Sequence, residues 1–591
     1  MPDTHSLHTM ILSETSIQSL AKSLAPHMGE PVWPGLTDPV VIARAREFAR
    51  QSGLWDKIDV ELHPHVDIPV LKRSAFRDYK RTGSRKAGED AVYARVNETR
   101  LAALALWIEH PKADADYLQD LIWAWCETTW WVFAAHENIR VDLFSSARAC
   151  ELAEYSHIFS GQLEPEVRAR ISREVATRVL DIAHDYRCSD WWQTGDNNWN
   201  TVCNSNLIQT ALYEIKDPDQ LAAFIHPLCR RMDYAINYFT DDGGCVEGVE
   251  YWAYGFSNFV DAAIALYQRT GRKINLMAED KIQRICRFPM AAFLRAPVRA
   301  SFADGGNGYL NMGHALRINF LTDVPELFQL VETNANGLPE ISDIRALALY
   351  RGELPLRHTD RTDCLLPLLG LAKANAAEAD VVLAAQAGTN DVSHNHNDIG
   401  SFLLVKNGVA VLTDPGTPVY SAKTFGPKRY ELLMCRSRGH SVPIVNGYEQ
   451  QEGSAFFGSL AAEGLNGPGG KTIAIDMSRA YPDPTLLKLT RVLELGRDGT
   501  LRLVDRFKFS SKPLELEEAL VTFEPAQVRN GCVEVGHGVS ATTIRADVAG
   551  EFQVETFSPE QHEGLDPRPL HRVRFLPSSL AVEMCLSFLI E

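Results

Sequence analysis

Residues 487–509 read LKLTRVLELGRDGTLRLVDRFKF. Apolar and polar residues alternate over Leu487–Leu495 and again over Leu501–Phe509, and this period of two is typical of a half-buried β-strand. Between the two runs, Arg497-Asp498-Gly499 has the residue types of a tight turn. The stretch therefore predicts a β-hairpin. The same period beyond about residue 375 predicts an antiparallel sheet or sandwich.

The first half of the chain has a different period. Apolar residues recur every three or four positions between residues 87 and 295, as they do in amphipathic helices. All eleven tryptophans lie in this half, from Trp33 to Trp252. Because helices come first and strands follow without alternation, the pattern predicts two packed domains and not a doubly wound sheet. We place a helical domain at residues 1–375 and an antiparallel β domain at residues 376–591.

Composition sets the broad class of the protein. The chain has 591 residues, of which 23% are charged and 45% hydrophobic, and its mean hydropathy is −0.16. These values are typical of a folded globular protein and exclude the disordered, collagen-like and membrane-embedded classes. The 59 basic and 76 acidic residues give a net charge of −17, which repels nucleic acid at long range. We therefore expect no nucleic-acid partner.

Targeting and redox features indicate the cytoplasm. The N-terminus lacks a basic segment followed by a long apolar run, so no secretory signal is visible. No run of about 18 apolar residues occurs, which predicts that the chain does not span a membrane. Eleven cysteines are scattered without a CxxC motif, which predicts reduced and mostly buried thiols. We expect a cytoplasmic protein that has no membrane partner.

The densest polar cluster in the sequence is residues 393–398, Ser-His-Asn-His-Asn-Asp, directly before an apolar run. His394 and His396 are two positions apart, so on an extended chain both side chains point to the same side. Downstream, Asp414 and His440 add a carboxylate and a further imidazole. His396, Asp414 and His440 together form a ligand set that suits Zn²⁺. The alternative is that these three are hydrogen-bonded residues at strand ends.

Three further clusters hold polar or aromatic residues. Residues 191–200 combine three tryptophans with amides, which suits a sugar site, or else form a helix cap with core tryptophans. Within residues 247–255, Tyr251 and Tyr254 lie three positions apart and share a helix face, where packing is the alternative role. Residues 302–308 form a tight polar turn to which the sequence assigns no role.

In the same order, these clusters resemble the motifs of the heparinase II/III superfamily of polysaccharide lyases, which includes the oligoalginate lyases. The matching motifs are Asn-Asn-Trp-Asn at 197–200, Glu-Gly-x-x-Tyr-Trp-x-Tyr-Gly at 247–255, His-Asn-His-Asn-Asp-x-Gly-Ser-Phe at 394–402, Asp-Pro-Gly at 414–416 and Arg-Ser-x-x-His at 436–440. The resemblance covers the chain from about residue 142 to residue 440. It implies a multidomain α and β fold, with an N-terminal incomplete (α/α) toroid followed by a C-terminal antiparallel β-sandwich. The change of period agrees with that architecture.

The resemblance also implies a reaction. Lyases of this family cleave the bond at C4 of a uronic acid by β-elimination, which removes the proton at C5. By similarity, Asn198 and His394 would neutralise the uronate carboxylate, and Tyr251 would act as the acid and as a candidate for the base. Tyrosine has an ordinary pKa of about 10, so nearby positive charge would have to lower it. We expect that charge to come from His394, Arg436 or Arg438.

The same resemblance implies further site residues. Zinc held by His396, Asp414 and His440 would be structural and would fix the loop of His394. Substrate-binding residues would be Trp199, Tyr254, Tyr420, Arg436 and Arg438. Some relatives have a histidine that acts as base where this chain has Trp199, so here proton abstraction would fall to Tyr251 or His394. Ser441 follows the third zinc ligand, where relatives commonly have asparagine.

The leading hypothesis is a carbon–oxygen lyase that acts on uronate-containing oligosaccharides, exolytically, because a cytoplasmic enzyme would meet imported oligomers. Its partner would be an acidic oligosaccharide; the identity of the uronate and a homo-oligomeric state are left open. One alternative is a glycoside hydrolase on the same toroid, with Asp242 and Glu247 or Asp304 as its carboxylates. Another is a non-catalytic sugar-binding protein, which would bind substrate without forming product.

Overall fold

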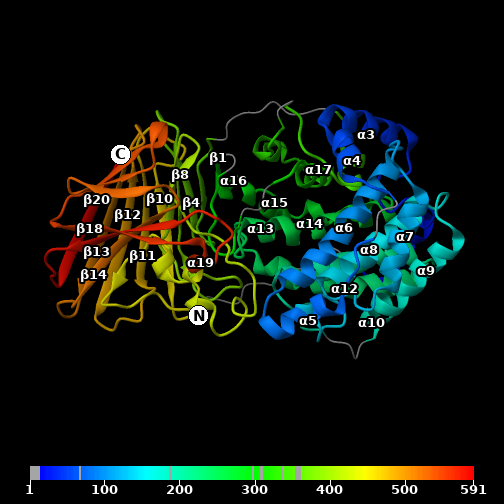
Figure 1. Ribbon diagram of the computed structural model, residues 1–591, viewed down its shortest axis with the longest axis horizontal. Coiled ribbons are helices and arrows are strands. Elements are labelled where there is room, and N and C mark those ends of the chain that lie inside the picture. The colour runs from blue at the N-terminus through cyan, green and yellow to red at the C-terminus, as the bar shows by residue number, and fades with distance from the viewer. Residues whose placement is uncertain are drawn as a thin grey trace. The chain divides into compact units, whose positions relative to one another are not determined.

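The computed structural model describes residues 14–64, 68–185, 190–295, 298–306, 310–334, 337–352 and 361–591. The chain forms two compact units, one helical and one built mainly of β-strands (Figure 1). The helical unit consists of Met1–Phe239, Trp252–Gln283 and Leu310–Leu356. The β unit consists of Thr240–Tyr251, Arg284–Tyr309 and Arg357–Glu591. Two short stretches from the first half of the chain therefore belong to the β unit.

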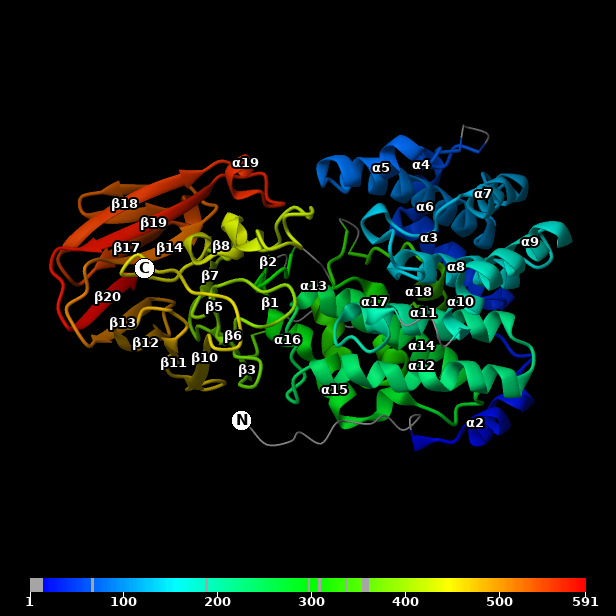
Figure 2. The same cartoon turned by 90° about the horizontal axis from the view of Figure 1, so that it is seen from below.

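Helix α11 (Asn198–Glu214) forms the centre of the helical unit. Its residues are buried without a break from Asn200 to Tyr213, and a helix that is buried on every face lies inside its unit. Helices α8 (Leu143–Ile158), α12 (Pro218–Tyr238) and α14 (Ser257–Arg269) pack against it (Figure 2). The other helices of this unit are α2 (Ile17–Leu24), α3 (Pro39–Ser52), α4 (Leu54–Glu61), α5 (Arg73–Thr82), α6 (Lys86–Trp107), α7 (Ala115–Glu127), α9 (Pro165–Val175), α10 (Asp181–His184), α17 (Met312–Leu321) and α18 (Ile344–Leu349). Helix α15 (Asp280–Cys286) crosses from this unit into the β unit.

Antiparallel sheets make up the β unit. The largest has the strand order β15-β16-β17-β20-β13-β12-β11-β10-β6, and two others have the orders β3-β4-β5-β7-β8 and β18-β19-β14-β9. The strands of the largest sheet are β6 (Gly388–Thr389), β10 (Phe457–Glu463), β11 (Lys471–Arg479), β12 (Leu486–Leu495), β13 (Leu501–Phe509), β15 (Ala526–Arg529), β16 (Cys532–Val535), β17 (Thr542–Ala546) and β20 (Glu583–Ile590). The five-stranded sheet contains β3 (Cys364–Leu366), β4 (Leu371–Asn375), β5 (Val381–Gln386), β7 (Phe402–Lys406) and β8 (Val409–Leu412). The four-stranded sheet contains β9 (Ile444–Val445), β14 (Leu516–Thr522), β18 (Gly550–Phe557) and β19 (Leu570–Pro577).

One apolar core joins these three sheets. It includes Leu383 from the five-stranded sheet, Leu493 from the largest sheet and Val573 from the four-stranded sheet. Sheets that share a core in this way form a sandwich. The β unit also contains a small sheet of β1 (Phe293–Arg295) and β2 (Val298–Arg299), and the short helices α13 (Val249–Tyr251), α16 (Phe288–Ala292) and α19 (Pro559–His562).

The predicted hairpin at residues 487–509 is confirmed. Strands β12 and β13 pair in antiparallel register from Leu486 opposite Phe509 to Leu495 opposite Leu501. Leu489, Leu493, Leu503 and Phe507 are buried, as the alternating pattern requires. The predicted fold class, a helical toroid followed by an antiparallel β-sandwich, is confirmed as well.

The division of the chain differs from the predicted boundary between residues 375 and 376. Residue 375 ends strand β4, which pairs with β5 in the five-stranded sheet, so a boundary there would cut through a sheet. The β unit resumes at Arg357, and it also includes Thr240–Tyr251 and Arg284–Tyr309. Sequence periodicity could not assign these two stretches because they are short and mostly irregular.

Two further sequence expectations can be compared with the described residues. Ten cysteines lie in the described part of the chain and all of them are free thiols, as predicted. Among the described helices, none combines the length and the apolar character needed to cross a membrane.

Candidate functional site

Four side chains of the β unit gather around the buried carboxylate of Asp304. We call this group the Asp304 cluster; it comprises Tyr251, Asp304, His394, Tyr420 and Arg429. Tyr251 ends helix α13 and Arg429 begins a 3₁₀ turn, whereas the other three lie in loops. The cluster is therefore assembled from helix ends and loops, and no member lies within a β-strand.

Two glycines bring the segments of Tyr251 and Asp304 together. Gly248 has a φ of 91°, in the left-handed region that favours glycine. A Cβ atom at Gly248 would lie 2.9 Å from the Cα of Gly305, which no real side chain tolerates. The segment that leads to Tyr251 thus lies directly on the turn that holds Asp304.

Asp304 accepts hydrogen bonds on both of its oxygens. His394 Nδ1 lies 2.7 Å from Oδ2, and Tyr420 Oη donates to the same oxygen at 3.1 Å. Arg429 Nη2 donates to Oδ1 at 2.9 Å, and His396 Nε2 also lies 2.9 Å from Oδ1. Burying a carboxylate is costly unless it is paired and hydrogen-bonded, and here four donors meet that need. Asp304 is therefore held both in its charged form and in position.

The two tyrosine hydroxyls and the imidazole of this cluster are in direct contact. Tyr251 Oη is hydrogen-bonded to Tyr420 Oη, and the ring of Tyr251 stacks on that of His394 with centroids 4.0 Å apart. Because Tyr420 donates its own proton to Asp304, its oxygen can accept the proton of Tyr251. His394 Nε2, on the far side of the ring from Nδ1, lies 3.7 Å from Glu247 Oε1. The cluster therefore presents a phenol and an imidazole side by side.

The charges of the cluster favour the neutral phenol. Burial would raise the pKa of Asp304, but hydrogen bonds from His394 and His396 and the charge of Arg429 hold it well below its usual value. Burial and the Asp304 carboxylate in turn raise the pKa of Tyr251 well above 10. The expectation that positive charge lowers the pKa of Tyr251 is therefore wrong for this structure, because the nearest strong charge is negative.

Arg436 and Arg438 form ion pairs away from the cluster. Arg436 Nε donates to Glu449 at 2.9 Å, and Arg438 Nη2 donates to Glu555 at 3.1 Å. Within the described residues, neither guanidinium is hydrogen-bonded to a member of the Asp304 cluster. Both side chains stay at least 40% exposed, so their role in substrate binding remains a prediction.

The backbone at His394 departs from the expected extended chain. His394 has a φ of 61°, a left-handed conformation that costs a non-glycine residue about 1–2 kcal/mol. The side chains of His394 and His396 therefore do not point to one side as they would on a strand. They still reach the same carboxylate, one on each oxygen of Asp304.

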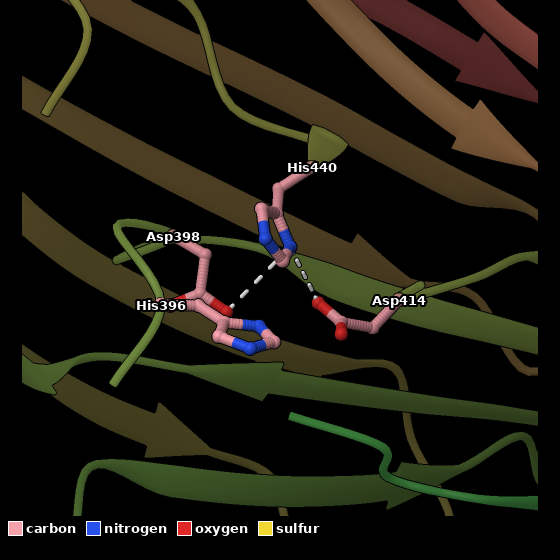
Figure 3. Close-up of side chains that lie close together, drawn as sticks. All are labelled: His396, Asp398, Asp414 and His440. Atoms are coloured by element: carbon pink, nitrogen blue, oxygen red, sulfur yellow. Dashed lines mark hydrogen bonds and ion pairs between the residues drawn. The ribbon is translucent and has the colours of Figure 1, made fainter. Parts of the chain in front are cut away.

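A second group of buried side chains adjoins the Asp304 cluster, and Figure 3 shows how it converges. We call it the metal cluster; it comprises His396, Asp398, Asp414 and His440. One ligand atom from each residue lies within 4.8 Å of the others. His440 Nδ1 lies 2.8 Å from Asp414 Oδ2 and 3.6 Å from Asp398 Oδ2. The three predicted zinc ligands are thus together, and the structure adds Asp398.

The hydrogen bonds of the two imidazoles fit a metal ion. His440 Nε2 lies 2.9 Å from the carbonyl oxygen of Met434, and His396 Nε2 lies 2.9 Å from Asp304. With Nε2 protonated, each ring offers its Nδ1 lone pair to the cluster, which is the outer-shell pattern typical of metal ligands. His396 Nδ1 and Asp398 Oδ2 are buried and have no hydrogen-bond partner among the described residues. The donor set of two imidazoles and carboxylates suits Zn²⁺.

Electrostatics at the metal cluster also favour a cation. Burial would lower the pKa of His440, but the carboxylates of Asp414 and Asp398 outweigh it and raise that pKa to about 9. Burial raises the pKa of Asp398 to about 7, with His440 opposing the shift and Asp414 adding to it. The carboxyl groups of Asp398 and Asp414 thus favour a positive charge at the centre of the metal cluster.

Another grouping of ligand types, formed by Asp304, His396 and Cys435, fits a metal less well. Burial raises the pKa of the Cys435 thiol to about 12, so the thiolate form is disfavoured. Asp304 also already binds the guanidinium of Arg429, whose positive charge would repel a cation. The metal cluster is therefore the better site.

The helical unit brings the other predicted residues together. Trp199, in the first turn of α11, has its ring centroid 5.2 Å from that of Trp191 and 4.6 Å from that of His136. His136 Nδ1 lies 2.8 Å from the buried carboxylate of Asp142. Trp191 is 49% exposed, so a tryptophan face is open to solvent beside this group.

Asn198 and Tyr254 meet through a glycine. Gly255 lies in the π-helical turn Trp252–Phe256, and a Cβ atom there would stand 3.1 Å from the Cβ of Asn198. The turn of Tyr254 therefore packs against the start of α11. Tyr254 is exposed at this point whereas Asn198 is buried.

Three residues of these clusters are absent from the predicted lyase site. The sequence offers Asp304 only as a carboxylate of the hydrolase alternative, in a polar turn whose Asn307 and Gly308 lie outside the described residues. Asp398 stands inside the quoted motif but was not chosen as a ligand. No sequence signal identifies Arg429, because its role depends on the loop that carries it.

Residues 360–549 match the family model described as "Heparinase II/III-like, C-terminal". Comparison with curated proteins gives no match. Among solved structures, a heparinase III aligns with a TM-score of 0.61 at 13% identity, over 96% of this chain and 93% of that one. A heparan sulfate lyase from Pedobacter heparinus aligns with a TM-score of 0.53 at 12% identity, over 98% of this chain and 88% of that one. These structural matches establish a shared fold.

Proposed function

Because the chain contains a C-terminal domain of the heparinase II/III-like family, we propose that this protein is a polysaccharide lyase. Its substrate would be a uronate-containing oligosaccharide, cleaved by β-elimination to give a 4,5-unsaturated uronate. The observation that carries this proposal is the contact of Tyr251 with His394 and Tyr420, both of which are hydrogen-bonded to one buried carboxylate.

Elimination needs a proton donor for the leaving O4, and Tyr251 is suited to that role. Burial and Asp304 raise its pKa, so it carries a proton at neutral pH. The hydrogen bond to Tyr420 orients the hydroxyl. A positioned acid of this kind contributes on the order of 10²- to 10⁴-fold to a rate.

Elimination also needs an acceptor for the C5 proton, and the geometry favours His394 over Tyr251. Asp304 holds the Nδ1 side of the ring, so a neutral His394 that donates from Nδ1 has its lone pair on Nε2. An imidazole oriented by a buried carboxylate in this way can act as a base. Tyr251 would first have to lose a proton that its surroundings retain.

The resemblance assigns His394 a different role, the neutralisation of the uronate carboxylate, and the two roles can be separated. Donation from Nε2 requires the protonated ring, whereas proton abstraction requires the neutral ring. The rate should therefore be greatest where the ring is neutral if His394 is the base. It should be greatest where the ring is protonated if His394 neutralises the carboxylate.

The helical unit would supply substrate contacts. We propose that Asn198 donates to the uronate carboxylate, and that Trp199 and Tyr254 bind sugar rings. Trp191, exposed beside Trp199, offers a further ring face. Exolytic cleavage remains part of this proposal.

Zinc would bind His396, Asp398, Asp414 and His440 in a structural role. When bound, it would supply positive charge that links the loop of His396 to the chain after β8 and to the segment before β9. The protein side chains alone would carry out the proton transfers.

No observation favours a glycoside hydrolase. That reaction needs a carboxylic acid that holds a proton, and the pKa of Asp304 is held well below its usual value. Asp242 is hydrogen-bonded to the backbone N–H groups of Gly244 and Leu368. Asp304 is therefore unsuited to be the general acid of a hydrolase, and Asp242 instead holds the local backbone.

The decisive experiment is to follow ultraviolet absorbance at about 235 nm while the purified protein is incubated with alginate, hyaluronan, chondroitin, heparan and glucuronan fragments. A rise with any of them supports elimination and names the uronate class, because only elimination forms the conjugated double bond. Binding without a rise would support the sugar-binding alternative. New reducing ends without a rise would support hydrolysis.

A further inference from the structure

We infer that Asp304 is a positioning residue shared by both clusters. Through Oδ1 it orients His396 toward a bound metal ion, and through Oδ2 it orients His394 and Tyr420 for proton transfer. The catalytic half of this inference rests on the proposed function, whereas the metal half does not.

The first support is the way in which the partners divide between the two oxygens. Oδ1 lies 2.9 Å from His396 Nε2, and Oδ2 lies 2.7 Å from His394 Nδ1. Each histidine therefore has its own oxygen, and Tyr420 shares Oδ2 with His394. One carboxylate group is thus hydrogen-bonded both to His396 of the metal cluster and to Tyr420 of the Asp304 cluster.

The second support is the tautomer of His396 that the hydrogen bond to Asp304 selects. A carboxylate accepts hydrogen bonds only, so it holds the proton of His396 on Nε2. Nδ1 then has a lone pair directed away from Asp304, buried and without a hydrogen-bond partner among the described residues. Carboxylate partners of this kind fix the orientation of a metal-binding histidine, and losing one typically weakens metal affinity about 10- to 100-fold.

The third support is the fixed position of Asp304 itself. Arg429 Nη2 donates to Oδ1 at 2.9 Å, while Arg429 Nε donates to the carbonyl oxygen of Asn395 at 3.1 Å. Asn395 lies between the two histidines in sequence. Arg429 therefore ties the carboxylate to the same loop that carries His394 and His396, so that the three side chains keep their alignment.

The test uses full-length protein and the variant Asp304→Asn, which keeps the shape of the side chain but loses its charge. Zinc affinity is measured by competition with a chromophoric chelator, and kcat and KM are measured on the oligosaccharide that the 235 nm assay identifies. We expect zinc to bind about 10- to 100-fold more weakly. We expect kcat to fall on the order of 100-fold while KM stays within about threefold, because binding contacts are retained.

Asp363→Asn is the matched control. Asp363 is also a buried aspartate of the β unit, with Lys471 Nζ at 2.6 Å and the backbone N–H of Asn375 at 2.7 Å. Its loss should lower stability but leave zinc affinity and kcat at the wild-type values. Tyr420→Phe should lower kcat and leave zinc affinity unchanged, because Tyr420 contacts only Oδ2.

Arg429→Gln provides a second test if Asp304→Asn does not fold. It keeps the carboxylate but removes the charge that fixes it, so both zinc affinity and kcat should fall severalfold. Wild-type zinc affinity in either folded variant would overturn the metal half, and wild-type kcat would overturn the catalytic half. If no oligosaccharide is cleaved by the wild type, the proposed function fails. The zinc affinities of the same variants then still decide the metal half.

Discussion

Two groups of buried charges in the β unit have similar composition but different settings. In one, Arg491 binds Asp505 and Glu518, and all three side chains are at most 1% exposed. Arg491 Nε donates to Asp505 at 3.0 Å, and Nη2 donates to Glu518 at 2.9 Å. The other is the Asp304 cluster, where Arg429 and His394 bind one aspartate that also bonds to His396 of the metal cluster.

The two groups differ in the kind of backbone that carries their side chains. Arg491 and Asp505 are direct partners across β12 and β13, and Glu518 lies in β14, so strand pairing fixes all three. The Asp304 cluster is built from loops and helix ends, and its His394 ring stays 14% exposed. Buried charge alone therefore does not identify a reactive site. The Asp304 cluster differs from the Arg491 group in its loop-borne charges, its partly exposed imidazole and the neighbouring ligand atoms that have no hydrogen-bond partner among the described residues.

The largest expected difference between the two groups is in turnover, and removal of the Tyr251 hydroxyl tests it. Tyr251→Phe should lower kcat by about 10³-fold or more and change substrate affinity by less than about tenfold, because the proton donor is lost while the ring remains. Turnover at 235 nm and calorimetric binding measure the two effects. Tyr481→Phe, which removes a buried hydroxyl bonded to the Pro443 carbonyl, is the control and should keep full turnover. Full turnover by Tyr251→Phe would remove this residue from the mechanism.

The Arg491 group should respond in stability instead. Arg491→Met leaves the buried Asp505 carboxylate without its cation, and breaking a buried pair in this way costs about 3–5 kcal/mol. Urea unfolding measures the loss. The folded fraction should keep a kcat within about twofold of wild type. A stable variant that has lost its turnover would contradict the distinction drawn between the two groups.

Removal of zinc should lower the free energy of unfolding by less than the loss of Arg491 does. A ligand present at 100 times its dissociation constant stabilises the folded state by about 2.7 kcal/mol. We therefore expect a loss of about that size when a chelator replaces buffered zinc, measured by urea unfolding. His440→Gln should abolish the response, whereas His562→Gln, at another buried histidine of the β unit, should retain it. A folded, active protein that contains no zinc by elemental analysis would exclude the metal.

The smallest effect concerns the pH dependence of the Arg491 group. Burial and the charge of Asp505 raise the pKa of Glu518 well above its ordinary value, despite Arg491. The folded protein therefore holds a proton that the unfolded chain releases above about pH 4.5, and this contribution to stability is lost as pH rises. Glu518→Gln removes the dependence, so its stability relative to wild type should improve by about 1 kcal/mol or more between pH 4.5 and pH 7. Parallel unfolding curves for both proteins across that range would contradict the shift.

The helices and strands could be predicted from the sequence because apolar residues recur in them at a regular period. The period of two over residues 487–509 gave the hairpin with both strands at nearly the right residues. The histidines and Asp414 were accessible because they stand in dense local motifs. Both kinds of signal depend on residues that are close together in the chain.

The centre of the site was not accessible for the opposite reason. Asp304 precedes His394 by 90 residues, and their contact depends on where loops fold and not on any period. The pKa of Tyr251 was expected to fall because its negative neighbour, Asp304, was unknown. The resemblance points to Arg436 and Arg438 of the Arg-Ser-x-x-His motif, whereas Arg429 is the arginine that reaches the carboxylate.

Each of the two units is built from three separate stretches of the chain, and this limits how the chain can be cut into transferable segments. A genetic exchange of residues 357–591 would transfer His394, Tyr420, Arg429 and the whole metal cluster, but it would leave Tyr251 and Asp304 behind. The β unit is therefore not a portable module, although much of it is one continuous segment. Recombination between relatives would preserve the site only where both parents place the same residues in the short early stretches. The Asp304 cluster accordingly depends on three separate segments of the chain, and none of them carries it alone.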